Sequence, residues 1–253
     1  MAQNYAFTYI ISYRNKPDRL QNLRRVLDWI NGFGGVEVIL VEQDTHSKIS
    51  HLNLKAKHHF LKSNMPFNKS WGFNYGLKHA NSNIIIFGDS DLIMDPNAFI
   101  NGLNLLKDYS MVNPYNSVID LTPQETGFQF NDMFNINRAG RGENDIQKVP
   151  LCGGICMFRR EDIIKIGGFN ENFIGWGAED DCESVIVKNF LTWTELPAKC
   201  YHLYHDRPAP DMVLYNRNLQ LLQKVSQMNK EQLTKMIQTQ IPKMGMKNKY
   251  DTF

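Results

Sequence analysis

Apolar and polar residues in the first part of the chain alternate between two patterns. Residues 5–12 (YAFTYIIS) are rich in aromatic and β-branched side chains, which predicts a buried strand. Residues 19–29 place apolar side chains three and four positions apart, which predicts an amphipathic helix. Two further strands over residues 36–41 and 83–88 and a second helix over residues 71–79 continue the pattern. Strands that alternate with helices imply an α/β fold with a parallel sheet.

The pattern is lost in the middle of the chain and returns near its end. Residues 120–148 are polar and glycine-bearing with little periodicity, so we expect a long loop that serves as a lid rather than a disordered segment. After Pro210, apolar residues recur at helical spacing up to Pro242, which predicts one or two amphipathic helices. The lysines within residues 243–249 predict a solvated basic tail.

Composition narrows the class of protein. Hydrophobic residues make up 42% of the 253 and charged residues 21%, which is ordinary for a globular protein and excludes intrinsic disorder. A net charge of +2 is too balanced for a protein whose main partner is nucleic acid. We find no apolar run long enough to span a membrane and no signal-peptide pattern, and four sparse cysteines predict reduced thiols. We therefore expect a cytoplasmic protein without a membrane span.

A first candidate for chemistry is the segment IIIFGDSDLIMDP, residues 84–96. It brings Asp89, Ser90 and Asp91 to the C-terminal end of a predicted buried strand, which is the edge where open parallel sheets bind ligands. Two carboxylates there can hold a divalent cation that neutralises a diphosphate. Asp and Ser also favour surface turns, and for an isolated Asp-x-Asp that interpretation stays open.

A second candidate is the segment GGFNENFIGWGAEDDC, residues 167–182. Trp176 lies between two glycines and offers a flat apolar wall of the kind that sugar rings pack against. Glu179 and Asp180 follow it, where the dipole of a helix start favours anions and where a carboxylate can act as a general base. A charged helix start without a catalytic role is the alternative, and we favour the functional interpretation.

A third candidate is the pair His202 and His205, which follows a strand predicted over residues 190–196. Two histidines at this spacing are usually not a metal site. If the sheet brings them beside Asp91, their imidazole nitrogens and its carboxylate would suit a divalent first-row metal such as manganese.

Four more side chains and one glycine are consistent with a bound phosphate or nucleotide, although each is unspecific alone. They lie at predicted strand ends, before a predicted helix and in a glycine pair that either admits a ligand to the backbone or makes a turn. These residues are Ser12, Arg14, Glu42, Lys69 and Gly154.

The order of these pieces resembles the metal-dependent inverting glycosyltransferases of GT-A fold, most closely the β-1,4-galactosyltransferase family and its chondroitin-polymerase-like relatives. The resemblance covers about residues 5–208, and an ordered run of matches of this kind is specific. The matching segments are Ser12–Lys16, Phe67–Lys69, the FGDSDLI strand end, Cys152–Gly154, Gly168–Phe169 and Gly175–Asp181.

The resemblance implies a GT-A (Rossmann-like) fold with a mostly parallel central sheet. It places a catalytic domain over residues 1–208, with a nucleotide-binding half of about 1–96 and an acceptor half of about 97–208. Residues 209–253 lie outside the resemblance as a helical C-terminal extension with a basic tail. That extension either covers the domain or makes a homodimer contact.

The resemblance also implies a reaction, the transfer of a sugar from a UDP-sugar to a hydroxyl of a glycan or other acceptor, with inversion, in polysaccharide biosynthesis. Asp180 would be the base, Glu179 would hydrogen-bond the sugar or acceptor, and Trp176 would pack against a sugar. Arg14 and Lys69 would contact the diphosphate. The Mn²⁺ or Mg²⁺ ion would be held by Asp91 and His205, with His202 as a less secure ligand. We expect further donor contacts from Ser12, Glu42, Asp89, Ser90 and Gly154.

Four departures from the family pattern bear on these expectations. Its distal metal motif, Met-x-x-His, reads His-Leu-Tyr-His here, which makes His205 a safer ligand than His202. Ala178 replaces a glycine and Cys182 an acid, so the resemblance does not identify which sugar is donated. No membrane anchor precedes the predicted domain, unlike in Golgi members, so we expect a bacterial or viral cytoplasmic enzyme.

Other function classes fit the sequence less well. A non-catalytic module that binds a sugar nucleotide or glycan would not need the acidic block. A metal-dependent phosphohydrolase resembling the haloacid dehalogenases would carry its Asp-x-Asp near the N-terminus rather than at residue 89. A glycosidase would use paired carboxylates but would leave Asp91 and the histidines without a role.

Overall fold

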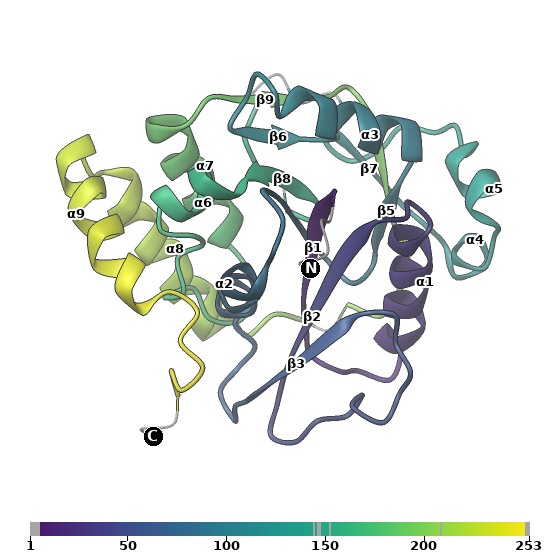
Figure 1. Cartoon of the computed structure of the whole chain (residues 1–253), viewed down its shortest axis with the longest axis horizontal. Coiled ribbons are helices and arrows are strands. Elements are labelled where there is room, and N and C mark those ends of the chain that lie inside the picture. The colour runs from purple at the N-terminus through teal and green to yellow at the C-terminus, as the bar shows by residue number, and fades with distance from the viewer. Residues whose placement is uncertain (1–5, 144, 146–147, 152, 208, 251–253) are drawn as a thin grey trace.

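The computed structural model describes residues 6–143, 145, 148–151, 153–207 and 209–250. Two sheets lie at the centre of the structure, with helices on both faces of the larger one (Figure 1). The larger sheet contains, in spatial order, β3 (Lys57–Lys62), β2 (Val36–Asp44), β1 (Phe7–Tyr13), β4 (Ile84–Gly88), β8 (Cys156–Arg159), β6 (Met111–Asn113) and β9 (Trp193–Glu195). The smaller sheet contains β5 (Leu92–Met94), β10 (Lys199–His202) and β7 (Ser117–Asp120).

Most neighbours in the larger sheet are parallel. The pairs β3–β2, β2–β1, β1–β4 and β6–β9 are parallel, whereas β8 runs antiparallel to both β4 and β6. The helices are α1 (Arg19–Asn31), α2 (Lys69–His79), α3 (Pro96–Leu105), α4 (Pro123–Thr126), α5 (Phe130–Phe134), α6 (Arg160–Lys165), α7 (Glu179–Phe190), α8 (Met212–Ser226) and α9 (Lys230–Gln240), followed by the 3₁₀ turn η1 (Ile241–Lys243). The predicted α/β fold with a mostly parallel sheet is confirmed.

The core has two layers because successive residues of β1 face opposite sides of the sheet. Tyr9 and Ile11 pack in one layer with Trp29 of α1. Ile10 packs in the other layer, where α2 covers the sheet. A Cβ atom at Gly76 of α2 would lie 2.4 Å from Cγ2 of Ile10, so this glycine allows α2 to lie close against β1. The tight contact fixes the position of α2, whose first residue belongs to the candidate site.

Several predicted elements differ from the structure. Residues 57–62 form the strand β3, which we did not predict. The strand expected over residues 190–196 is limited to β9, because α7 continues to Phe190. The expected long loop at residues 120–148 contains α4 and α5. The segment from Phe128 into α5 contacts α1, where the Arg25 guanidinium donates to the backbone oxygen of Phe128 at 2.5 Å and lies over the Phe130 ring.

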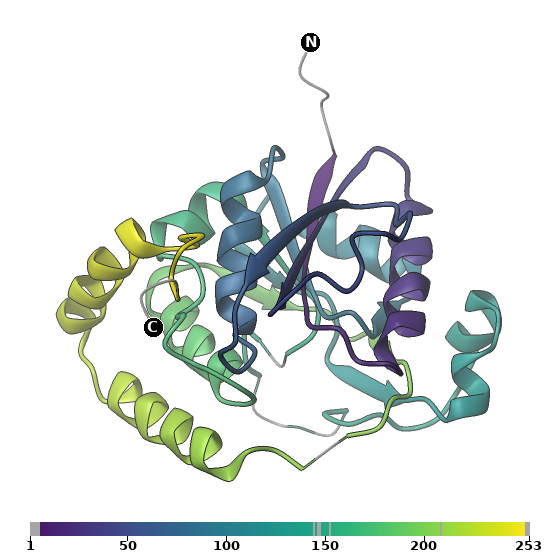
Figure 2. The ribbon, with the colours of Figure 1, turned by 90° about the horizontal axis from the view of Figure 1, so that it is seen from below.

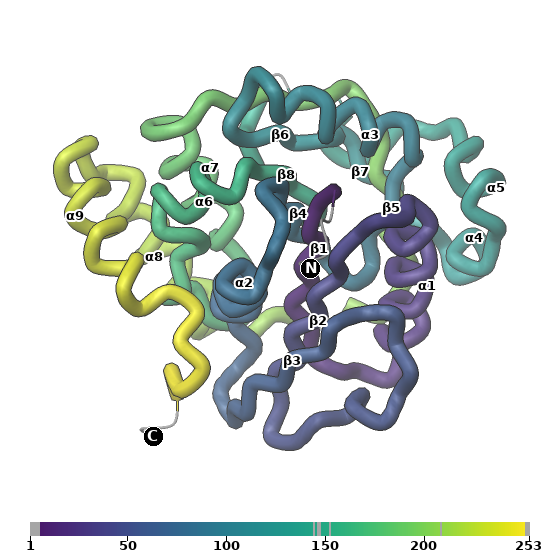
Figure 3. Tube along the Cα trace, viewed as in Figure 1, coloured from purple at the N-terminus to yellow at the C-terminus, as the bar shows by residue number. Residues whose placement is uncertain are grey.

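The C-terminal part forms the two helices α8 and α9, as predicted, and both lie along one side of the molecule (Figure 2). The tail after α9 returns to α2 (Figure 3), so the expectation of a solvated tail is wrong for Lys249, which forms an ion pair with Glu171. Cys156, Cys182 and Cys200 are buried, and Cys152 lies outside the described residues. None of the described helices combines the length and hydropathy that crossing a membrane requires. The domain limits and the homodimer contact stay predictions.

Candidate active site

The turn between β4 and β5 brings the Asp-x-Asp motif to the C-terminal edge of the large sheet. β4 ends at Gly88, where a Cβ atom would lie 1.9 Å from the hydroxyl oxygen of Tyr9. Glycine is therefore required for Tyr9 of the neighbouring strand to fit beside β4. Asp89 and Asp91 follow immediately and belong to two adjoining groups of side chains. The motif lies where the sequence predicted it.

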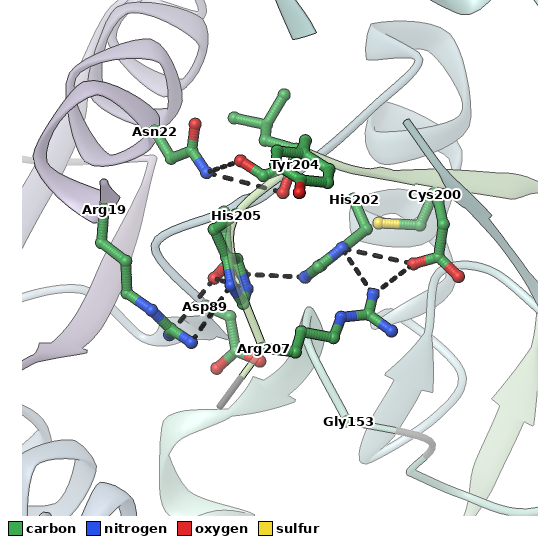
Figure 4. A network of polar contacts seen from close by, with 12 residues as sticks. Arg19, Asn22, Asp89, Gly153, Cys200, His202, Tyr204, His205 and Arg207 are labelled. Carbon is green, nitrogen blue, oxygen red and sulfur yellow. Dashed lines mark hydrogen bonds and ion pairs between the residues drawn. The ribbon is translucent and has the colours of Figure 1, made fainter. Parts of the chain in front are cut away.

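The first group contains Asp91, His202 and His205, and one ligand atom from each lies within 4.8 Å of the others. Antiparallel pairing of β10 with β5 places His202 opposite Leu92, and the backbone N–H of Leu203 donates to the carbonyl of Asp91 at 2.8 Å. Nε2 of His205 lies 3.3 Å and Nε2 of His202 3.8 Å from the Asp91 carboxylate (Figure 4). The structure therefore brings the three predicted metal ligands together.

Hydrogen bonds orient both imidazoles in this group. Nδ1 of His205 donates to the backbone oxygen of Asp206 at 2.8 Å, which leaves Nε2 to face Asp91. Nδ1 of His202 forms a hydrogen bond with Nη2 of Arg207 at 3.0 Å and lies 3.3 Å from the carboxylate of Asp120 at the end of β7. A carboxylate or carbonyl behind a histidine is the usual support for a metal-ligating ring. Both rings thus present Nε2 to the same point.

The charges in the group shift three pKa values. Burial alone would raise the pKa of Asp91, but the hydrogen bond with His205 and the charges around it outweigh burial and lower that pKa. The same hydrogen bond raises the pKa of His205. Burial lowers the pKa of His202. An ionised carboxylate beside an imidazole that stays neutral is a donor set that a divalent cation can use.

Three arginines surround this group, and the sequence analysis did not identify them. Arg19 at the start of α1 places Nη1 3.5 Å from the Asp91 carboxylate. Its buried Nε has no hydrogen-bond partner among the described residues. Arg141 and Arg207 both donate to Asp120, at 2.7 Å and 2.5 Å. No local motif marks these residues, since each contact joins segments far apart in the chain.

The second group centres on Lys69, which begins α2 directly after the helix cap Asn68. Its Nζ lies 3.3 Å from Asp89, 3.4 Å from Asp180 and 3.8 Å from Glu179. The last two carboxylates belong to the first turn of α7. One ammonium thus joins the metal motif to the acidic block, two segments that the sequence analysis considered separately.

Burial and mutual repulsion shift the pKa values of the second group. Burial would lower the pKa of Lys69, but the three carboxylates, Asp180 first, outweigh it and raise that pKa well above its usual range. Burial is the main cause that raises the pKa of Asp89 to about 6 and that of Glu179 to about 7. At neutral pH the group therefore carries less negative charge than three ionised carboxylates would.

Left-handed backbone conformations shape the walls around Asp180. Gly153 and Gly154 have φ values of 83° and 79°. A Cβ atom at Gly153 would lie 3.1 Å from Oδ2 of Asp180, and one at Gly154 would overlap the Tyr115 hydroxyl. Ala178, directly before α7, has a φ of 71° and is the one non-glycine residue with positive φ among those described. The departure from glycine noted in the sequence therefore falls at a strained position.

Trp176 lies on the surface, three residues before Glu179, and is 65% exposed. Tyr215 of α8 stacks on it, with ring centroids 5.4 Å apart and an interplanar angle of 27°. The side-chain amide of Asn218 donates to the backbone oxygens of Ile174 and Gly177 on either side of Trp176. The C-terminal extension thus holds the loop that leads into Glu179 and Asp180.

The other predicted donor residues lie around the sheet edge and differ in their hydrogen-bond partners. Nε of Arg14 donates to the backbone oxygen of Gln43 at 2.8 Å, and its buried Nη2 has no partner in the described part of the chain. Ser12 accepts from Gln43 at 3.1 Å. The Glu42 carboxylate accepts from Ser47 at 2.6 Å and from the Lys48 backbone at 2.7 Å, so it holds its own loop. Ser90 is buried between the two aspartates. The donor contacts of these residues stay predictions.

A cavity of about 460 Å³ opens beside the first group. It is lined on one side by the segment after β7 and on the other by the segment after β10. The lining residues are Asp120, Leu121, Thr122, Pro123, His202, Tyr204, His205, Asp206 and Arg207. Basic and acidic side chains therefore share this space with the imidazoles that face Asp91.

Comparison with protein families gives two matches. The model of glycosyl transferase family 2 matches residues 8–167, from β1 to the segment just after α6, and includes the Asp-x-Asp motif. A model described as the N-terminal domain of galactosyltransferase matches residues 145–206, which include Asp180 and both histidines. Among curated protein sequences, none matches the chain.

Comparison with solved structures finds the same fold in glycosyltransferases. The catalytic domain of Drosophila beta1,4galactosyltransferase 7, in complex with xylobiose, has a TM-score of 0.54 at 17% identity, over 88% of this chain and 81% of that one. The mannosyltransferase PcManGT from Pyrobaculum calidifontis, with GDP-Man and Mn²⁺, has a TM-score of 0.52 at 19% identity, over 81% and 58%. GalNAc-T7, with UDP, GalNAc and Mn²⁺, has a TM-score of 0.54 at 14% identity, over 86% and 48%. At these identities the likeness is one of fold, and the expected GT-A fold is confirmed.

Proposed function

The chain belongs to glycosyl transferase family 2, and from this premise we propose that it transfers a sugar from a UDP-sugar to an acceptor hydroxyl with inversion at the anomeric carbon. The observation that carries the proposal is the convergence of Asp89, Glu179 and Asp180 on Lys69, next to the group of Asp91 with two histidines. The proposed base Asp180, the ammonium of Lys69 and the candidate metal group then lie around one edge of the sheet. The cytoplasmic location and the role in polysaccharide biosynthesis stay predictions.

The donor set supports a divalent cation. One carboxylate and two imidazoles that present Nε2 fit Mn²⁺, and Asp91, His202 and His205 would hold it. A cation bound there supplies positive charge to the diphosphate on which negative charge develops. PcManGT and GalNAc-T7 were crystallised with Mn²⁺ and a nucleotide or nucleotide sugar, which favours the same assignment for this chain.

Basic side chains at the edge of the sheet fit a diphosphate. Arg14 has a buried Nη2 without a partner, and Arg19 has a buried Nε in the same state among the described residues. A desolvated guanidinium nitrogen without a partner is costly, and a phosphate oxygen would satisfy it. Lys69 would contribute a third positive charge when the nucleotide enters. These three cations would bind the diphosphate and stabilise it as it leaves.

Asp180 is the residue that we assign as the general base. Its side chain is 24% exposed, so the carboxylate is open to an acceptor. It would accept the proton of the acceptor hydroxyl as that oxygen forms a bond to the anomeric carbon. The bond from the anomeric carbon to the diphosphate oxygen breaks on the opposite face, and its electron pair leaves with UDP. Glu179, with its raised pKa of about 7, can donate a hydrogen bond to a sugar oxygen.

The base is tested by two neighbouring substitutions. Asp180→Asn should bind UDP and Mn²⁺ as the wild type does but lose transfer by about 10²-fold or more. Asp181→Asn is the matched control, because Asp181 lies in the same helix turn with an exposed side chain. Transfer rates and calorimetric UDP affinities are measured for both variants. Near wild-type transfer by Asp180→Asn would remove the proposed base.

A further inference from the structure

The C-terminal tail, residues 244–250, is folded against the first turns of α2 (Figure 3). The indole N–H of Trp71 donates to the backbone oxygen of Met246 at 2.8 Å, and the Tyr250 ring meets the Trp71 ring edge-on at 4.9 Å. A Cβ atom at Gly245 would lie 2.6 Å from the backbone of Asn74, so the tail backbone lies directly on the helix. These contacts join the end of the chain to the helix that begins with Lys69.

A buried carboxylate anchors the tail. Glu171 is 7% exposed, and one of its oxygens accepts from the backbone N–H of Gly245 at 2.6 Å and from the amide of Asn74 at 2.8 Å. Its other oxygen accepts from Nζ of Lys249 at 2.5 Å. A buried charge is tolerated when it is paired and hydrogen-bonded, and the tail supplies two of these three partners. The tail is therefore a required part of this packing and not a loose end.

The cap of α2 is shared with the tail. The Asn68 side-chain oxygen accepts from the N–H of Trp71 at 2.9 Å, which caps the helix. The amide nitrogen of the same side chain donates to the Tyr250 hydroxyl at 2.8 Å and to the backbone oxygen of Glu171 at 2.8 Å. Release of the tail would remove the hydrogen bond between the Asn68 side chain and Tyr250. Lys69 directly follows Asn68 in the chain.

We infer that the tail is a positioning element that fixes the first turn of α2, and through it directs Lys69 toward Asp89 and Asp180. The inference rests on the proposed function, in which Lys69 meets the diphosphate. It assigns a role to a segment that lies outside both family matches. Lys249 and Tyr250 act through Lys69 and Asn68 and do not touch the reacting atoms.

Nucleotide affinity tests the inference in the full chain. Lys249→Ala should weaken binding of UDP in the presence of Mn²⁺ by about tenfold, as measured by calorimetry, and Lys249→Arg should restore most of it because the pair with Glu171 is kept. Lys247→Ala is the matched control, since Lys247 lies exposed in the same tail. Unchanged UDP affinity in Lys249→Ala would overturn the inference.

A double-mutant cycle separates positioning from general stability. If the tail acts through Lys69, Lys249→Ala should have no further effect on UDP affinity in a Lys69→Ala background. A role limited to stability would lower the unfolding temperature but leave UDP affinity unchanged, whereas an effect on affinity that does not pass through Lys69 would add to that of Lys69→Ala. Additive effects would contradict the inference.

Amide hydrogen exchange tests the same point without any nucleotide. Lys249→Ala should exchange faster than the wild type at the amides of Trp71 and Gly72, with α1 as the internal reference. Unchanged exchange at these amides would overturn the inference. If the wild type binds no UDP, the proposed nucleotide site fails, and the exchange result still decides the role of the tail.

Discussion

Replacement of Lys69 by methionine should destabilise the protein, because it removes the cation that three carboxylates share. Removal of one partner from a buried ion pair costs about 3–5 kcal/mol. The side chains of Asp180 and Asp89 are 24% and 32% exposed, so water screens part of the repulsion that is left. We therefore expect the free energy of unfolding to fall by about 2–3 kcal/mol near pH 8.

The loss of stability in Lys69→Met should depend on pH in a direction set by Glu179. Its pKa is raised from 4.5 to about 7 in the folded protein, so the folded state binds the proton more tightly than the unfolded state. Stability from this group is therefore present in full at low pH and falls by about 3 kcal/mol as pH rises from about 4.5 to 7. Without Lys69 the pKa rises further, and the fall extends above pH 7. The variant should differ little from the wild type near pH 5 and most near pH 8.

Urea unfolding of the metal-free protein at both pH values measures this difference. Lys78→Met is the matched control, because Lys78 lies exposed at the other end of α2, where its loss should cost less than about 1 kcal/mol. An equal loss of stability near pH 5 and pH 8 would refute the reasoning. So would a Lys69→Met protein as stable as the wild type at both values.

Three further predictions concern the backbone and the metal group. Ala178→Gly should raise the free energy of unfolding by up to about 1 kcal/mol in chemical denaturation, because glycine adopts the left-handed conformation without strain; a loss of stability would contradict this. Arg19→Gln should strengthen Mn²⁺ binding in the absence of nucleotide and weaken UDP binding, because a positive charge 3.5 Å from Asp91 opposes the metal and favours the diphosphate. Calorimetry measures both affinities, and weaker Mn²⁺ binding by the variant would contradict this prediction. Gly154→Ala should lower the free energy of unfolding by about 2 kcal/mol or more, because residue 154 has a positive φ and an alanine Cβ there would lie 2.5 Å from the Tyr115 hydroxyl. An unchanged unfolding curve would contradict the packing described for Gly154.

Local sequence pattern was sufficient to predict the central strands and the acidic segments. β1, β2 and β4 are rich in apolar residues and buried along most of their length, which is typical of strands inside a parallel sheet. β3 was missed because it lies at the edge of the sheet and its sequence, KHHFLK, is largely polar. The lid region was expected to be irregular because α4 and α5 are too short to show helical periodicity.

Contacts between distant segments account for what the sequence did not predict in the site. Asp91 and His205 were both candidates, but their meeting depends on the pairing of β10 with β5. Arg19 carries no motif of its own and becomes relevant because α1 begins beside Asp91. The ion pair of Lys249 with Glu171 joins positions 78 residues apart, so the lysine looked like part of a solvated tail.

Release of UDP from a panel of UDP-sugars tests the central claim most directly. The assay is run with Mn²⁺, with Mn²⁺ and a chelator, and with Asp91→Ala in place of the wild type. The account predicts release of UDP from at least one sugar, loss of that release with the chelator, and loss in Asp91→Ala by about 10²-fold or more. No release from any UDP-sugar, together with no UDP binding by calorimetry, would contradict the account and favour a module that binds glycans without catalysis.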